Sequence, residues 1–118
     1  MPLPVLQGTQ TKSINEVHLA QALDEAGIEY DYSHWLGSQG ERGSTEVDFL
    51  VTNGTHITPV DVGAEGYFHS QRTAAKDLLE ILTIERYGKY YGWDEMIYAT
   101  VEETATLDAA REFVKKNF

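Results

Sequence analysis

The stretch that most constrains the fold of this chain is TEVDFLVTNGTHITPVDVGAEG, residues 45–66. Two apolar, β-prone segments flank Asn53-Gly54, and Asn-Gly between such segments is the strongest short-range signal of a β-hairpin. The sequence therefore predicts two antiparallel strands joined by a tight turn at this dipeptide. Each of these strands also carries acidic residues, and the second strand runs directly into Gly63.

A turn centred on this dipeptide would place Glu46 opposite Asp61 and Asp48 opposite Pro59. Because side chains alternate between the two sides of a strand, the three acids share one side of the hairpin. The other side collects the apolar residues Val47, Phe49, Val51, Val60 and Val62. Opposite Cβ atoms lie about 5 Å apart and diagonal ones about 7–8 Å, which brings the three carboxylates within reach of one ion. The alternative is that this side is the solvated outer face of an antiparallel sheet.

The remaining segments predict helices and further strands around the hairpin. A capping box of Ser13 and Glu16, with Gly27 as the stop, marks the first helix. Gly88 is the expected stop of the second helix. We expect an α-β-β-β-α-β-α order in a single α/β domain at residues 13–118, after an N-terminal arm at 1–12 that is either loose or a short strand. The expected elements are helix 14–26, strand 28–36, loop 37–44, the hairpin, connection 63–70, helix 71–88, strand 95–102 and helix 106–118.

Composition narrows the function classes. The chain has 118 residues with 42% hydrophobic content and no cysteine, which fits one folded domain without disulfides or thiolate metal sites. No apolar run approaches the ~18 residues of a membrane span, and the first residues lack the regions of a signal peptide. These features predict a cytoplasmic protein with no membrane partner. Nineteen acidic residues against nine Lys and Arg disfavour strong autonomous binding of nucleic acid, although divalent ions neutralise clustered carboxylates.

The two long helices add polar candidates to the acids of the hairpin. Glu16 falls on the apolar stripe of its helix, where an acid is costly unless it is paired. It can complete the capping box with Ser13, supply a fourth oxygen ligand, or do both. Gln71 falls on the apolar stripe of the second helix, Arg72 lies at the boundary of that stripe, and Lys76 points away from it.

The pattern EVDFLVTNGTHITPVDV resembles the paired-strand signature of the PD-(D/E)XK nuclease superfamily, written here as Asp48, a hairpin and Asp61-Val62-Gly63. It is most similar to the nuclease-like C-terminal domain of a family of bacterial and archaeal AAA-type ATPases. Asn15-Glu16 at a helix start and Trp35 before a Gly-rich gap extend the resemblance, which covers roughly residues 13 to 102. It implies a restriction-endonuclease-like αβββαβ core, with a mixed central sheet flanked by helices.

The resemblance also implies a chemistry. Asp48 and Asp61 would hold Mg²⁺ or Mn²⁺, assisted by the Val62 carbonyl and Glu16, and the shared face of the hairpin adds Glu46 to this ligand set. The metal would orient a water and stabilise charge on a scissile phosphate. Gln71 is similar to a glutamine that many relatives carry on the helix after the second strand.

One position departs from the pattern. Gly63 stands where the superfamily has its catalytic lysine. Candidates for a substitute basic residue are Arg72, Lys76 and His69, while Glu65 adds another acid nearby.

Two functions follow from this departure. The first is a metal-dependent nuclease, an endonuclease or exonuclease, with reduced activity. The second is an inactive nuclease-fold module for protein interaction or regulation, associated with an ATPase. A third interpretation gives the surface acids no role. The expected partners are nucleic acid bound weakly, an ATPase domain or another protein, and a second copy of the chain.

Overall fold

The computed structural model describes the chain except for residues 1–2, 38–43 and 64–70 and the side chains of 71–77. The expected order of helices and strands is confirmed, as a mixed α/β arrangement. Most of the expected loop 37–44 and connection 63–70 lies outside the described residues. The elements are β1 (Val5–Leu6), β2 (Thr9–Gln10), α1 (Ile14–Glu25), β3 (Glu29–Leu36), β4 (Thr45–Asn53), β5 (His56–Val62), α2 (Gln71–Tyr91), β6 (Ile97–Ala99), the 3₁₀ helix η1 (Glu102–Thr104) and α3 (Leu107–Asn117).

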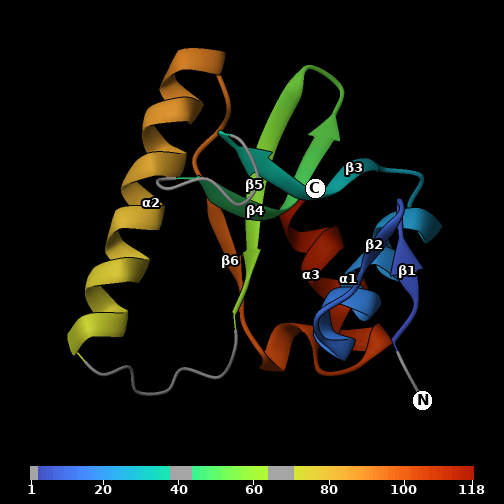
Figure 1. Cartoon of the computed structure of the whole chain (residues 1–118). Helices are drawn as coiled ribbons and strands as arrows, with labels where there is room; N and C mark the ends of the chain where they lie inside the picture. Colours follow the sequence, from blue (N-terminus) through green and yellow to red (C-terminus); the bar gives the residue numbers. More distant parts are fainter. Residues whose placement is uncertain (1–2, 38–43, 64–70) are drawn as a thin grey trace.

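The central sheet has the strand order β3-β4-β5-β6. The first three strands are antiparallel to their neighbours, and β6 pairs parallel to β5, so the sheet is mixed. Figure 1 shows this sheet between α2 on one side and α1 with α3 on the other. Buried side chains of α1 and α3 form the main core with Phe49, Val51 and Val60 of the sheet. In the described part of the chain, no helix has both the length and the apolar character needed to cross a membrane.

The predicted hairpin is present, but its predicted register is wrong. Phe49 pairs with Val60 and Leu50 with Pro59, and the two loop residues are Gly54 and Thr55. Gly54 has φ 65° as the first loop residue, as in the type II′ hairpin turn. The register is therefore shifted by two residues from the one expected for an Asn53-Gly54 turn. A shift of two changes which residues lie opposite each other but keeps the alternation of side chains along each strand, since the side-chain period of a strand is two.

A second, smaller core lies under α2. Val47, Leu36 and Ile84 form it, with Trp93 and Met96 packed against it. We expected Val47 to pack with Phe49 and Val51, and this was wrong. Ser33 of β3 has φ 58°, an unusual value for a non-glycine residue, and it is not paired with β4. Before it in the strand, Tyr32 packs in the main core, and after it Leu36 packs in the second core.

Local capping accounts for the first helix. Ser13 Oγ accepts a hydrogen bond from the Glu16 N–H at 3.2 Å, as the capping box predicts. At the other end Gly27 has φ 70°, and the Ile28 N–H donates to the Leu23 carbonyl at 3.0 Å. This is the Schellman arrangement, in which glycine takes the left-handed position. The predicted start and stop of α1 are both confirmed to within one residue.

Two predicted boundaries at the C-terminal half were wrong. Gly88 does not end α2, which continues to Tyr91 and stops before Gly92, with φ 76°. Gly88 is buried beside Trp93, whose N–H donates to the Gly88 carbonyl at 2.8 Å, so packing keeps a poor helix former within the helix. The strand expected at 95–102 is limited to β6, because the chain turns into η1 directly after it.

The first residues form a small hairpin of β1 and β2 rather than a loose arm. Its turn residue Gln7 links it to the edge of the main sheet. The Gln7 amide donates to the Tyr30 carbonyl at 2.7 Å and accepts from the Tyr32 N–H at 2.8 Å. These contacts fix the path of the chain toward Lys12 and α1.

The turn geometry predicts a difference between two glycines. Gly54→Ala should lower the free energy of unfolding by about 1–2 kcal/mol, because an L-residue with a side chain is strained at a left-handed φ. Gly63→Ala is the matched control: Gly63 has no positive φ, and a Cβ there would meet the Ala99 carbonyl oxygen at an ordinary 3.5 Å. Urea unfolding of both variants tests this, and equal stabilities would contradict the proposed turn.

Candidate functional site

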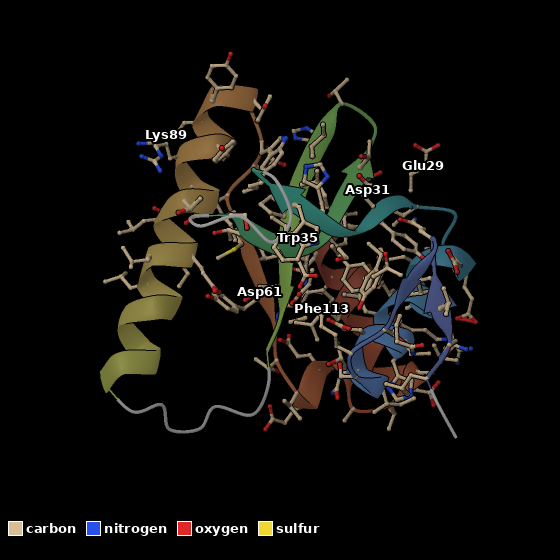
Figure 2. All side chains as sticks on the ribbon, viewed as in Figure 1. Glu29, Asp31, Trp35, Asp61, Lys89 and Phe113 are labelled. Carbon is tan, nitrogen blue, oxygen red and sulfur yellow. The ribbon has the colours of Figure 1, made fainter. Side chains whose placement is uncertain are left out.

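Two carboxyl groups meet where β4 and β5 run side by side. Asp48 of β4 is buried and its Oδ2 accepts a hydrogen bond from the Val62 N–H at 2.9 Å. Asp61 of β5 is partly buried, and its carboxyl is hydrogen-bonded to that of Asp48. Figure 2 labels Asp61 in the layer between the sheet and α2. The observed register, continued by one pair beyond Phe49 and Val60, puts the two aspartates opposite each other.

Asp61 is held in its protonated form. Burial raises its pKa most, followed by the hydrogen bond to Asp48 and the charges of Asp48 and Glu80, while the charge of Lys12 acts in the opposite direction. The result is a pKa of about 8 for the Asp61 carboxyl. Like charges this close raise the pKa of one partner, and such shifted groups are common at functional sites.

Lys12 supplies a positive charge at the same place. Its Nζ donates to Oε1 of Glu46 and, at 3.2 Å, to Oδ1 of Asp48. Burial lowers the pKa of Lys12, but the hydrogen bond to Glu46 and the charges of Asp48, Glu46 and Glu16 outweigh this and raise it above its usual value. Lys12 is therefore an ammonium group at neutral pH.

Sequence reasoning missed Lys12 because it lies in the segment that we took as an arm. One local signal indicates where its backbone lies. Lys12 immediately precedes the capping residue Ser13, so the start of α1 fixes the position of its backbone, and the inward-facing Glu16 lies one turn away. No local signal, however, shows that its side chain extends toward β4.

Glu16 faces inward as expected, with 3% of its surface exposed. Its Oε1 accepts hydrogen bonds from the Lys12 N–H at 2.9 Å and from the Tyr32 hydroxyl at 2.6 Å. Burial, and next the hydrogen bond to Glu16, raise the pKa of Tyr32, so the hydroxyl remains a donor. The Glu16 carboxylate therefore bonds to the backbone of Lys12, one residue before Ser13. This bond orients Lys12, whose side chain contacts Asp48.

Glu46 is fixed by two donors. Lys12 binds its Oε1, and the Ser33 hydroxyl donates to its Oε2 at 2.5 Å. Glu46 pairs across the sheet with Trp35 of β3, and the shifted register removes it from the position opposite Asp61 that we predicted. Within the described residues, no group of three or more His, Asp or Glu side chains is arranged to hold a metal ion. Asp48 and Asp61 are thus the two adjacent members of the predicted ligand set.

Other predicted residues lie at positions whose side chains are not described. Gln71, Arg72 and Lys76 belong to the first turns of α2, and the structure describes only their backbone. His69 and Glu65 lie outside the described residues. Gly63 is described: its N–H donates to the Ala99 carbonyl at 2.8 Å, which extends the pairing of β5 with β6 by one residue.

Comparisons with known proteins give one structural similarity. No protein-family model matches the chain, and no curated protein matches it. The crystal structure of AF1548, a protein of unknown function, is similar with a TM-score of 0.48 and 13% sequence identity. The similarity covers 75% of this chain and 47% of that one, so the chain spans about half the length of that protein.

The raised pKa of Asp61 predicts a stability that falls as pH rises. Between about pH 4 and pH 8 the folded chain keeps a proton that the unfolded chain has lost, so the free energy of unfolding decreases by up to about 1.4 kcal/mol per pH unit. Asp61→Asn should remove this component, leaving the variant more stable than wild type near pH 8.

Urea unfolding at several pH values between 4 and 8 measures this effect. Glu112→Gln, which removes one exposed acid from α3, is the control for the change in net charge. Parallel pH profiles for wild type and Asp61→Asn would contradict a protonated Asp61.

Proposed function

We propose that this chain is a divalent-metal-dependent phosphodiesterase domain that acts on nucleic acid, with Asp48 and Asp61 as its metal ligands. The observation that carries the proposal is the hydrogen-bonded pair of these two carboxyls, in which burial and mutual repulsion raise the pKa of Asp61 to about 8. Such a pair is stable only with a shared proton or a bound cation. The order of elements and the mixed sheet further support a restriction-endonuclease-like core as part of this proposal.

The donor set fits Mg²⁺ or Mn²⁺ rather than a closed structural site. Mg²⁺ retains several waters and is usually held by one or two carboxylates together with substrate phosphates. Asp48 and Asp61 supply the two carboxylates, and the Val62 carbonyl is the third oxygen that the resemblance implies. A divalent ion bound there would supply a water of lowered pKa and polarise a phosphate oxygen. Glu16 and Glu46, both predicted as ligands, have a further role in holding Lys12 in place.

Lys12 is the residue that we propose in place of the lysine missing at Gly63. Because its pKa is raised, it acts as a fixed positive charge and not as a base. An ammonium group beside Asp48 is suited to stabilise the negative charge that develops on a phosphate during hydrolysis. Glu16 orients the Lys12 backbone and Glu46 orients its side chain, so both acids have a positioning role.

A second candidate function is a protein-interaction module without catalysis, associated with an ATPase. The exposed leucines Leu78, Leu79 and Leu82 of α2 favour it. Large apolar side chains that gather on a surface often mark an interface. The metal titration below separates the two candidates, since an interaction module has no need of a cation between Asp48 and Asp61.

Metal binding is the first test of the proposal. Near neutral pH, millimolar Mg²⁺ or Mn²⁺ should bind wild type, raise its melting temperature and release a proton, because Asp61 must ionise to become a ligand. Isothermal titration calorimetry in two buffers of different ionisation enthalpy measures both the binding and the proton release.

Asp48→Asn and Asp61→Asn should each abolish binding, whereas Glu112→Gln, on the distant α3, should leave it unchanged. The proposal fails if wild type binds no metal at millimolar concentration, or if Asp61→Asn binds as tightly as wild type.

The role of Lys12 is tested by cleavage of labelled single-stranded, duplex and branched DNA with Mn²⁺. Lys12→Gln should lower the rate by about 10²–10³, the usual loss for one positioned donor at a developing charge. Adding Gly63→Lys to this variant should restore part of the rate, because it returns a lysine to the superfamily's position and a Cβ there would meet the Ala99 carbonyl oxygen at an ordinary 3.5 Å.

Lys115→Gln, an exposed lysine on α3, is the matched control and should cleave like wild type. An unchanged rate for Lys12→Gln would assign the cation to another residue, and Arg72→Gln and Lys76→Gln would then be the variants to measure.

A further inference from the structure

Four aromatic rings gather at the C-terminal end of α2, and we name Tyr87, Tyr90, Tyr91 and Trp93 the aromatic platform. Tyr91 stacks on Tyr87, with ring centres 6.2 Å apart, and on Trp93, at 5.5 Å. Tyr90 meets the edge of Tyr91 at 4.9 Å. Tyr90 is 82% exposed and Tyr91 57% exposed, which is unusual for rings that are in contact with one another. A folded chain that only needed these rings as core would bury them.

The backbone holds the platform in shape. Tyr87 and Tyr91 are four residues apart and so lie on one side of α2. Gly92, with φ 76°, turns the chain back so that Trp93 packs over Gly88 and is fixed by the hydrogen bond to its carbonyl. Trp93 and Tyr87 are partly buried against the second core, and Tyr90 and Tyr91 face solvent.

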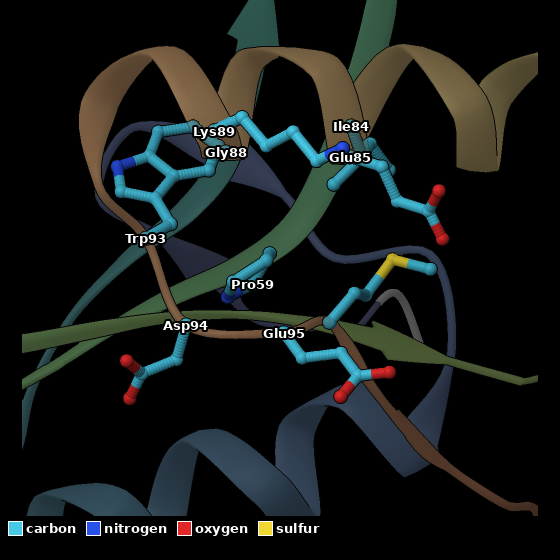
Figure 3. Close-up of a pocket in the computed structure, with 9 residues that line it drawn as sticks. Pro59, Ile84, Glu85, Gly88, Lys89, Trp93, Asp94 and Glu95 are labelled. Carbon is cyan, nitrogen blue, oxygen red and sulfur yellow. The ribbon is translucent and has the colours of Figure 1, made fainter.

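A positive charge lies on the tyrosine side of the platform. Arg86 lines a hollow of about 410 Å³ together with Tyr87, Tyr90 and Tyr91, and no acid lines it among the described residues. Lys89 is on the same turns of α2 but lines the hollow on the Trp93 side, where Figure 3 shows it beside Glu85. The tyrosine hollow therefore has one cation and no acid among its described lining residues, although the formal net charge of the chain is −10.

The neighbouring hollow has the opposite character. It measures about 220 Å³ and lies between α2, Pro59 and the segment after Trp93. Figure 3 shows three acids, Glu85, Asp94 and Glu95, and one cation, Lys89, around it. Its acids would repel a phosphate, so an anionic ligand is directed to the tyrosine side of α2.

We propose that the aromatic platform binds single-stranded nucleic acid, with bases stacked on Tyr90 and Tyr91 and a phosphate contacted by Arg86. Exposed aromatic rings beside a positive charge are the features by which proteins bind single strands without reading sequence. A proline-rich peptide also binds aromatic grooves, but it makes no use of Arg86.

The position of the platform connects it with the candidate active site, and this part of the inference rests on the proposed function. Glu80 of α2 lies close enough to Asp61 to act on its pKa, and Tyr87 is seven residues further along the same helix. At 1.5 Å per residue, this is about 10 Å along the axis of α2. A single strand held on the platform would thus pass near the Asp48–Asp61 pair.

Fluorescence anisotropy of a short labelled oligothymidylate, with EDTA at low salt, tests the binding without cleavage. Tyr90→Ala and Tyr91→Ala should each weaken the affinity by about fivefold or more. Tyr90→Phe keeps the ring and should bind like wild type, and thermal melts check that each variant is folded. Arg86→Gln should reduce the dependence of affinity on salt, while Lys115→Gln should not. An abasic strand with the same number of phosphates should bind more weakly than oligothymidylate.

The inference is overturned if oligothymidylate does not bind, if it binds equally well to Tyr90→Ala, or if a proline-rich peptide binds in its place. The same assay with Asp48→Asn separates the two proposals. If the chain binds oligothymidylate but no metal, the platform proposal holds and the phosphodiesterase proposal fails. If the chain cleaves DNA but Tyr90→Ala does not weaken binding, the phosphodiesterase proposal holds and the platform proposal fails.

Discussion

The pairing of β4 with β5 is the constraint on which the site depends. Phe49 and Val60 face each other and are both buried in the core beneath α1 and α3, so a slip by one residue would expose them. The two-residue turn that begins at Gly54 selects among the registers that keep them buried. In that register Asp48 reaches Asp61 and the Val62 N–H. The same apolar contacts that stabilise the sheet therefore hold two acids together on its other side.

The repulsion between these acids is offset by neighbouring groups. The ammonium of Lys12 contacts Glu46 and Asp48, and the backbone of Lys12 is bound by Glu16. Asp61 remains protonated, and among the described residues no buried side-chain nitrogen or oxygen lacks a hydrogen-bond partner. The start of α1 thus serves two purposes, because the capping residues that begin the helix also place a cation at the sheet. An assembly of this kind is stable without metal, and in the proposed function a metal ion would replace the shared proton.

Local features of this fold were predictable from the sequence and tertiary ones were not. The caps of α1 follow from Ser13 and Gly27, because each acts within a few residues of its own position. The hairpin was predictable but its register was not: turns at Asn53-Gly54 and Gly54-Thr55 both suit a left-handed Gly54, and they leave the same side chains on the same faces. Gly88 stays helical because Trp93 packs on it, which no propensity indicates. Lys12 contacts Glu46 and Asp48, which lie 34 and 36 residues further along the chain, and no local pattern indicates contacts at that distance.

Glu80, whose charge acts on Asp61, and the aromatic platform lie on one helix, α2, and this joins the two proposals in a single account of substrate binding beside a metal-dependent centre. Its central claim is that a divalent ion binds between Asp48 and Asp61. The most direct measurement is a crystal structure of the chain soaked with Mn²⁺, with anomalous differences recorded near the manganese edge. The account predicts an anomalous peak at bonding distance from both carboxylates. An empty position with the two carboxyls still hydrogen-bonded to each other would contradict it.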